Sequence, residues 1–226
     1  MNTKQKKIMF DKESHPLAQL EFIKERENWK KENIVIDNFK LEIAGHPVME
    51  RWEEPYMKKL AEIATMNGGK VLEVGFGLGI SASYIQEGSL EEHHIIEANE
   101  QVFEHMKIFA NSAKHHTFLY LGFWEDISSQ FEDEFFDGIL FDTYPITLEE
   151  LNTARFSFFS EAHRLLKVGG VFTHYSGELE FTDEYSSNLK KAGFSKYSGS
   201  LVSVNIPIDC LYWSNDKIMA PIIIKR

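Results

Sequence analysis

The sequence predicts an α/β fold, in which a mostly parallel β-sheet carries helices on both faces and an N-terminal helical arm packs on that core. Three observations predict it. Short apolar runs alternate with amphipathic stretches along residues 70–191. A glycine-rich turn at residues 75–79 joins the first of these runs to the first amphipathic stretch. The length of 226 residues suits one such core with an appendage, and is too short for two catalytic domains.

The N-terminal part is expected to be helical. Residues 14–31 are charged with spaced apolar side chains, which is typical of an amphipathic helix lying on another surface. Residues 48–66 repeat apolar side chains at helical spacing, carry Pro55 early and end at two glycines. We therefore expect residues 1–66 to form a helical lid or arm on a core of residues 67–226, all in one structural domain.

The core is expected to alternate strand and helix. The predicted strands are residues 70–74, 93–97, 117–121, 136–141, 171–174, 201–204, 211–213 and 222–224. The predicted helices are residues 79–86, 101–113, 147–166 and 183–191. This order predicts parallel strands with helices on both faces, closed by antiparallel strands near the C-terminus.

Composition and charge exclude several classes of function. The formal net charge is −11, and the Lys and Arg residues are scattered among carboxylates, so we expect no nucleic-acid partner and favour a small cationic substrate. The longest apolar runs are strand-sized, so no membrane partner is expected either. Monomer and homodimer both remain open.

Cysteine and histidine usage argues against disulfides and metals. Cys210 is the single cysteine, so no intrachain disulfide can form and a reducing compartment is expected. The N-terminus has no signal-type apolar region, so we expect a cytoplasmic protein. Adjacent histidines at 93–94 and 115–116 adjoin strands and point to opposite faces, so no metal is predicted.

The glycine-rich turn predicts a nucleotide-like ligand, because backbone there approaches a ligand closely. The dinucleotide fingerprint would need glycine where Ile80 stands, which disfavours NAD. Glu73, two residues before Gly75, suits a ligand with a positive centre and no phosphates, which describes S-adenosyl-L-methionine. Glu97, about twenty residues past the turn, stands where a carboxylate can accept ribose hydroxyls.

Two sequence motifs are more particular than the glycine-rich turn, namely Met49-Glu50-Arg51-Trp52-Glu53 and Asp142-Thr143-Tyr144-Pro145. With them, the sequence closely resembles the guanidinoacetate N-methyltransferase family. The likeness covers most of residues 45–175 and continues at Asp209-Cys210. The resemblance implies a Rossmann-like class I methyltransferase with a seven-stranded sheet, which uses S-adenosyl-L-methionine and releases S-adenosyl-L-homocysteine.

The resemblance also implies site residues. Glu53 and Asp142 would be catalytic and would bind the guanidino group. The other substrate contacts would be Trp29, Tyr144, His174 and Tyr175. The residues expected around the cofactor are Met49, Met57, Glu73, Gly75, Phe76, Gly77, Leu78, Gly79, Ile80, Ser81, Glu97, Ala98, Asn99, Trp124, Glu125 and Asp142.

Two departures from the family concern the substrate. The family has an N-terminal tryptophan that closes over the site, and Trp29 is the nearest candidate at a slightly different spacing from Met49. Residues 174–179 are shorter than the family's stretch, which contributes contacts to the substrate carboxylate. Guanidinoacetate, giving creatine, is therefore the first expected substrate, and the guanidino group of arginine or a related metabolite is the alternative.

Methylation of a guanidino group needs two carboxylates. A guanidinium has a pKa above about 12 and delocalised lone pairs, so it is a poor nucleophile. One carboxylate can hold two N–H groups in a fork while a second takes the proton from the attacking nitrogen. We expect Asp142, at the end of a strand, to be the base and Glu53 to be the second clamp. A non-catalytic S-adenosylmethionine-binding protein would be expected to lack this pair, and a nicotinamide oxidoreductase would need hydride-site residues that are not found.

Overall fold

The computed structural model describes residue 17, residues 20–151 and residues 153–226. Within this part of the chain, a seven-stranded sheet has the order β6-β5-β4-β7-β8-β10-β9. Its strands are β4 (Lys70–Val74), β5 (Glu92–Glu97), β6 (His116–Leu121), β7 (Phe136–Phe141), β8 (Leu166–His174), β9 (Lys196–Ser203) and β10 (Lys217–Ile224). The first five strands in this order are parallel, and β10 runs antiparallel to both β8 and β9. The predicted sheet, with its antiparallel closure, is confirmed.

Helices cover both faces of the sheet. They are α1 (Glu54–Ala64), α2 (Ile80–Glu87), α3 (Glu100–Ala110), α4 (Trp124–Ile127), α5 (Ala154–Ser157), α6 (Phe159–Leu165) and α7 (Asp183–Lys191). Strand β4 shows how the sequence divides them: Val71 packs in a cluster with α1 and α2, whereas Leu72 packs in a cluster with α6 and α7. Alternate side chains of a strand point to opposite faces, so an apolar run such as 71–72 builds both layers. No helix among these residues has the length and apolarity to cross a membrane.

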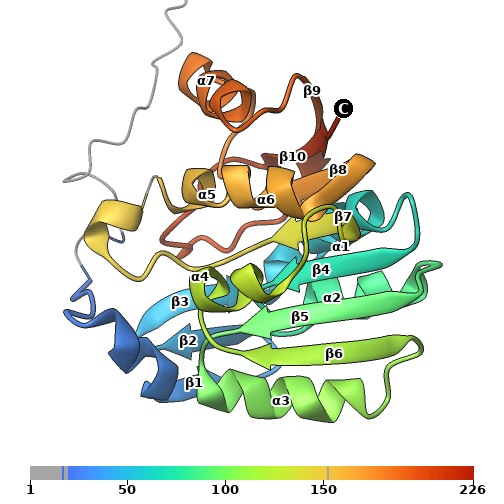
Figure 1. The fold of residues 1–226 in the computed structure, drawn as a ribbon. Helices are drawn as coiled ribbons and strands as arrows, with labels where there is room; N and C mark the ends of the chain where they lie inside the picture. Colours follow the sequence, from blue (N-terminus) through green and yellow to red (C-terminus); the bar gives the residue numbers. More distant parts are fainter. Residues whose placement is uncertain (1–16, 18–19, 152) are drawn as a thin grey trace, which may run out of the picture.

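A small antiparallel sheet, which the sequence analysis missed, precedes the core. It consists of β1 (Ile34–Ile36), β2 (Lys40–Ile43) and β3 (His46–Glu50). Figure 1 shows it at the left of the view, where β4, β5 and β6 end. Leu41 and Ile43 are buried while the residues between them are less so, which is the alternation expected of a strand with one covered face.

The predicted N-terminal helices are wrong in their extent. Residues 48–50 belong to β3, and α1 begins only at Glu54, after the 3-10 helix η3 (Arg51–Glu53). Pro55 stands in the first turn of α1, where proline marks a helix start. Of the helix predicted over 14–31, residues 14–16, 18 and 19 lie outside the described residues. From residue 20 onward only Arg26–Lys31 is helical, as the 3-10 helix η2.

Two predictions in the C-terminal half are also corrected. The helix predicted over 147–166 is broken into η5 (Leu148–Glu150), α5 and α6. The break between α5 and α6 falls at Phe158, whose fully buried ring stacks on Phe141 with centroids 4.4 Å apart. Residues 211–213 form no strand, because the edge of β10 is paired along its length with β9.

Candidate active site

A cavity of about 460 Å³ opens at the carboxyl ends of β4, β5 and β7. Ligands of open α/β sheets collect at this edge, and the volume is in the usual range for small-molecule sites. The N-terminal segment contributes Trp29, Met49 and Glu53 to its wall, and the C-terminal segment contributes Tyr212 and Trp213. Segments that are far apart in the sequence therefore surround one space.

Two glycines let the turn after β4 pass close to its neighbours. Gly75 has φ +91°, and a Cβ there would lie 1.9 Å from the carbonyl oxygen of Asp142. Gly77 has φ +56°, and a Cβ there would lie 2.8 Å from the sulfur of Met49. The Leu78 N–H donates to the same sulfur at 3.3 Å. A side chain at either glycine would push the turn out of the cavity wall.

Glu97 ends β5 with its carboxylate held in place. One oxygen accepts the backbone N–H of Phe76 at 3.0 Å, and the other accepts that of Asn99 at 2.8 Å. Burial raises the pKa of Glu97, and backbone hydrogen bonds oppose that rise. The residue lines the cavity, so a fixed acceptor stands where ribose hydroxyls could donate.

Asn99 ties the N-terminal segment to the core. Its side-chain oxygen caps α3 by accepting the backbone N–H groups of Gln101 and Val102. Its side-chain nitrogen donates to the carbonyls of Trp29 and Glu32, each at 2.9 Å. One buried amide thus fixes Trp29 beside the cavity.

Glu53 and Asp142 both face this cavity from unrelated parts of the chain. Glu53 ends η3 and is 3% exposed, and Asp142 directly follows β7. Burial, together with repulsion by Asp142, raises the pKa of Glu53 to about 8. Burial, together with repulsion by Glu73, raises the pKa of Asp142 to about 7. The pair can therefore hold or release protons near neutral pH.

Tyr212 is a site residue that the sequence analysis missed. Its hydroxyl donates to Glu53 Oε1 at 2.7 Å, and its ring lies 5.7 Å from that of Trp52. Glu53 Oε1 also accepts the backbone N–H of Glu50 at 2.8 Å. The contact joins residues 159 positions apart, so no local pattern could reveal it. It orients the Glu53 carboxylate from the side of the C-terminal segment.

Tyr212→Phe is expected to lower the kcat/KM of the reaction at this site roughly 10-fold at pH 7, because a hydrogen bond to a charged group is lost. This bond favours the ionised form of Glu53, so the acid limb of the pH profile should move to higher pH. Tyr84→Phe is the matched control, since the Tyr84 hydroxyl donates to Glu54 at 2.9 Å and neither residue lines the cavity. Equal losses in the two variants would contradict the role of Tyr212.

Aromatic side chains enclose the space beside Asp142. Trp29 is 5% exposed and stacks on Tyr144, with ring centroids 5.6 Å apart and planes 4° from parallel. The Tyr144 hydroxyl lies 3.0 Å from Nδ1 of His46. On the other side, Tyr175 packs edge-on against Tyr56. These rings place apolar surface beside the carboxylate pair.

The guanidinoacetate N-methyltransferase family model matches residues 21–226 of this chain. The chain belongs to that family. Its members are S-adenosylmethionine-dependent methyltransferases, so membership confirms the predicted cofactor and class of enzyme. The glycine turn that no Cβ could occupy and the fixed Glu97 carboxylate fit that cofactor.

Fungal relatives of this family member are named protein arginine N-methyltransferase 2. The protein from Yarrowia lipolytica is 28% identical over 168 residues, which cover 71% of this chain and 34% of the relative. The protein from Aspergillus oryzae is 35% identical over 133 residues, covering 58% and 32%. The protein from Emericella nidulans is 31% identical over 196 residues, covering 77% and 44%. The chain thus spans less than half the length of these relatives.

Solved structures share the fold of this family member. Spermidine synthase from Thermotoga maritima has a TM-score of 0.60 and 16% identity, covering 86% of this chain and 72% of that chain. TYW2 from M. jannaschii, in complex with AdoMet, has a TM-score of 0.56 and 14% identity, covering 86% and 85%. The predicted Rossmann-like class I fold is therefore confirmed.

The structure brings most residues predicted from the family to one cavity. Those that line it are Trp29, Met49, Glu53, Gly75, Gly77, Glu97, Ala98, Trp124, Glu125, Asp142, Tyr144 and Tyr175. The predicted residues outside the lining are Met57, Glu73, Phe76, Leu78, Gly79, Ile80, Ser81, Asn99 and His174. Most of the second set belong to the glycine turn and the start of α2, directly behind the wall.

Two residues of the second set are engaged elsewhere. Glu73 is fully buried, accepts the Ser81 hydroxyl and lies 3.0 Å from Nε2 of His93, so it braces the turn from behind. His174 is also fully buried, with its ring bonded to the Tyr185 hydroxyl and the Tyr175 carbonyl. Burial lowers the pKa of His174 to about 3. The neutral ring faces α7 and does not line the cavity, so its predicted substrate contact stays a prediction.

Proposed function

We propose that this chain transfers a methyl group from S-adenosylmethionine to a guanidino nitrogen of a small molecule, with guanidinoacetate as first candidate and creatine as product. The observation that carries the proposal is the convergence of Glu53 and Asp142 on the cavity that the glycine turn also lines. The catalytic roles of Glu53 and Asp142, and the residues that would contact the cofactor, are part of this proposal.

A guanidinium is the ligand that best relieves this pair. Two buried carboxylates without a cation are costly, which is why both pKa values are raised. A guanidinium carries a positive charge and planar N–H donors that match carboxylate oxygens. Its binding would let both carboxyls ionise and would release protons to solvent.

The two carboxylates would divide the work. Glu53, held by Tyr212 and the Glu50 N–H, would fix the plane of the guanidinium. Asp142 would accept the proton of the attacking nitrogen, and a pKa of about 7 suits a base that works near neutral pH. Bound S-adenosylmethionine supplies the methyl group on a sulfonium.

We also propose a division of the chain around this chemistry. Residues 67–226 would hold the cofactor through the glycine turn, Glu97, Ala98, Trp124 and Glu125. Residues up to 66 would act as the lid, because they bring Trp29, Met49 and Glu53 over the carboxyl ends of the strands. The lid would exclude water while the substrate is held.

Arginine is the second candidate, and the names of the fungal relatives favour it. It presents the same guanidinium to the same carboxylates, either as the free amino acid or within a protein chain. A non-catalytic binding role is disfavoured, because both acids are present in the wall of the cavity, with Glu53 buried and Asp142 partly buried.

A methyl-transfer assay tests the proposal. The purified protein is given S-adenosylmethionine with guanidinoacetate, free arginine or an arginine-containing peptide, and S-adenosylhomocysteine is followed. Turnover of guanidinoacetate above the other two supports the first candidate, and turnover of either arginine substrate above guanidinoacetate replaces it with the second. No turnover with any of them, while the cofactor binds, rejects guanidino methylation.

The pH dependence of kcat/KM should have an acid limb near neutrality. Because the pKa values of Asp142 and Glu53 are about 7 and 8, protons occupy the site below that range and a cationic substrate must displace them. We expect kcat/KM to rise with pH up to about 8 and then level off. A profile that is flat from pH 5 to 9 would contradict the raised pKa values.

A further inference from the structure

The wall of the cavity carries opposite charges in different places. Glu53 and Asp142 form its acidic region. Among the described lining residues, the cationic side chains are those of Arg26 and Arg155. The surroundings of these two arginines show which of them lies on the side of the carboxylate pair.

Arg26 belongs to the cofactor side of the cavity. Its guanidinium pairs with Glu125 and lies over the ring of Phe123, 4.2 Å from the centroid. Phe123 and Glu125 follow β6, which is the edge strand of the sheet. Asp142 follows β7, and β5 and β4 lie between these two strands. Arg26 is therefore far from the carboxylate pair and close to the predicted cofactor contacts.

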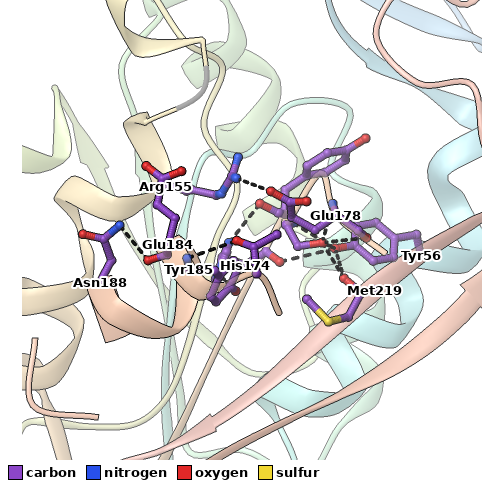
Figure 2. A network of polar contacts seen from close by, with 11 residues as sticks. Tyr56, Arg155, His174, Glu178, Glu184, Tyr185, Asn188 and Met219 are labelled. Carbon is purple, nitrogen blue, oxygen red and sulfur yellow. Dashed lines mark hydrogen bonds and ion pairs between the residues drawn. The ribbon is translucent and has the colours of Figure 1, made fainter. Parts of the chain in front are cut away.

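Arg155 lies on the opposite side, next to the residues that follow β8. Its Nη2 donates to Glu178 at 2.8 Å, and its guanidinium lies 4.6 Å from the ring centroid of Phe156. Its Nε is buried and has no hydrogen-bond partner among the described residues. Figure 2 shows the Arg155 side chain extended towards Glu178.

The positions of Arg155 and Asp142 are linked by neighbouring strands. β7 and β8 are parallel neighbours, and the Tyr175 N–H still donates to the Phe141 carbonyl at 3.1 Å. Asp142 therefore leaves β7 level with Tyr175, and Gly177 follows two residues later. A Cβ on Gly177 would meet Arg155 Nη1 at 3.9 Å. The Arg155 guanidinium therefore lies beside Gly177, in the same wall of the cavity as Asp142.

We propose that Arg155 binds a carboxylate of the substrate, so that the site selects free guanidino acids over guanidino compounds that lack a carboxylate. The inference rests on the proposed guanidino methylation and adds the residue that would recognise the carboxylate of its substrate. An arginine within a protein chain has no free carboxylate at that place, so the inference disfavours it as substrate. A guanidino acid carries opposite charges at its two ends, as does this part of the cavity.

The Glu178 contact leaves Arg155 able to bind a second anion. A guanidinium has five N–H donors. Arg155 donates to Glu178 through Nη2. Ser176 and the Met219 N–H hold the Glu178 backbone, with Met219 N to Glu178 O at 2.8 Å. The glutamate therefore anchors the arginine through Nη2, while Nη1 remains available for a ligand.

The test compares guanidinoacetate with methylguanidine, which has the same guanidino group and no carboxylate. We expect the wild-type protein to prefer guanidinoacetate in kcat/KM by at least about 100-fold. Arg155→Gln should raise the KM for guanidinoacetate roughly 10- to 100-fold, as expected for a lost bond between charged groups, and leave methylguanidine within about 3-fold. Arg155→Lys should recover part of the loss, because it restores the charge without the fork.

Two further variants separate binding from folding. Arg164→Gln is the matched control, because Arg164 also bonds carboxylates, Glu161 and Asp133, and does not line the cavity; it should leave the preference for guanidinoacetate unchanged. If Arg155→Gln fails to fold, Glu178→Gln takes its place. It keeps Arg155 and removes its fixed counter-charge, so the KM for guanidinoacetate should fall and that for methylguanidine should not.

Each outcome decides the inference. Loss of the preference in Arg155→Gln, or its strengthening in Glu178→Gln, supports it. Equal losses for both substrates in Arg155→Gln would show a structural role and overturn it, and so would a wild-type protein that shows no preference. If the wild-type protein binds S-adenosylmethionine and methylates an arginine-containing peptide but neither of these two compounds, the inference is overturned while guanidino methylation stands. If it methylates no guanidino compound, the proposed function itself fails, and the inference fails with it.

Discussion

Asp142→Asn is expected to lower kcat/KM for the guanidino substrate at least about 1,000-fold. General bases contribute roughly 100- to 10,000-fold, and an amide cannot accept the proton that the attacking nitrogen must lose. The variant also leaves a buried guanidinium beside a neutral group, which weakens substrate binding. The loss should appear in both kcat and KM, measured by release of S-adenosylhomocysteine at pH 8.

The structure predicts that this loss occurs without misfolding. The backbone N–H of Asp142 donates to Val74 at 2.9 Å, and its carbonyl faces Gly75, so the residue is positioned by main-chain contacts that asparagine retains. Asp137→Asn is the matched control on the same strand. Asp137 pairs with Lys167 and the Lys70 N–H outside the cavity, so this variant should lose stability and keep kcat.

Calorimetric titration with S-adenosylmethionine completes the comparison. The Kd of Asp142→Asn for the cofactor should lie within about 10-fold of the wild-type value, because neutralising one side chain removes the binding energy of about one hydrogen bond to a charged group. A variant that retains more than a tenth of the wild-type kcat would remove Asp142 from the role of base. A variant that no longer binds the cofactor would instead make it a cofactor contact.

The core of the fold was predictable from local pattern. Strands such as β4 and β7 are short apolar runs between polar breaks, and the glycine turn marks the passage from β4 to α2. The N-terminal part was not, because Met49, Trp52 and Tyr56 recur at helical spacing across a boundary between strand and helix. Met49 stands in β3, before α1 begins, and its sulfur accepts the Leu78 N–H of the glycine turn. Tertiary packing decided where periodicity was ambiguous.

The site was predictable to the extent that it is carried by sequence motifs. Glu53 and Asp142 follow from the family resemblance, and the structure brings both to one cavity. Tyr212 and Arg155 do not, since their roles depend on contacts between distant segments. The segment of Tyr212 carries apolar neighbours that suggested a strand, yet Leu211 is exposed and Tyr212 bonds Glu53. Only the folded chain shows which polar group meets which.

Glu53→Gln is expected to separate activity from stability. Activity should fall roughly 100-fold in kcat/KM, because the amide can no longer neutralise the guanidinium or hold two of its N–H groups as a carboxylate does. Stability should rise at alkaline pH. Glutamine keeps the shape of the side chain, and its oxygen can still accept from Tyr212 and from the Glu50 N–H.

The sign of the stability change follows from the pKa of Glu53, which is raised in the folded protein to about 8 from 4.5. Between these values the folded state holds a proton that the unfolded state has lost, so the free energy of unfolding falls as pH rises. Glutamine is neutral throughout and avoids that loss. The Tm difference, variant minus wild type, should therefore be near zero at pH 5 and positive at pH 8, by about 2–4 °C for each 1 kcal/mol gained in a domain of this size.

Glu62→Gln provides the comparison, because Glu62 lies on α1 with half of its side chain exposed and pairs with Lys59 at the surface. Its Tm difference from the wild type should stay flat over the same pH range. Glu53→Gln could instead be less stable than the wild type at pH 8. The ionised Glu53 carboxylate would then stabilise the substrate-free protein, which requires that groups in the cavity already compensate its charge. A gain in stability with a loss of activity would mean that the fold keeps an unfavourable buried carboxyl because a cationic substrate requires it.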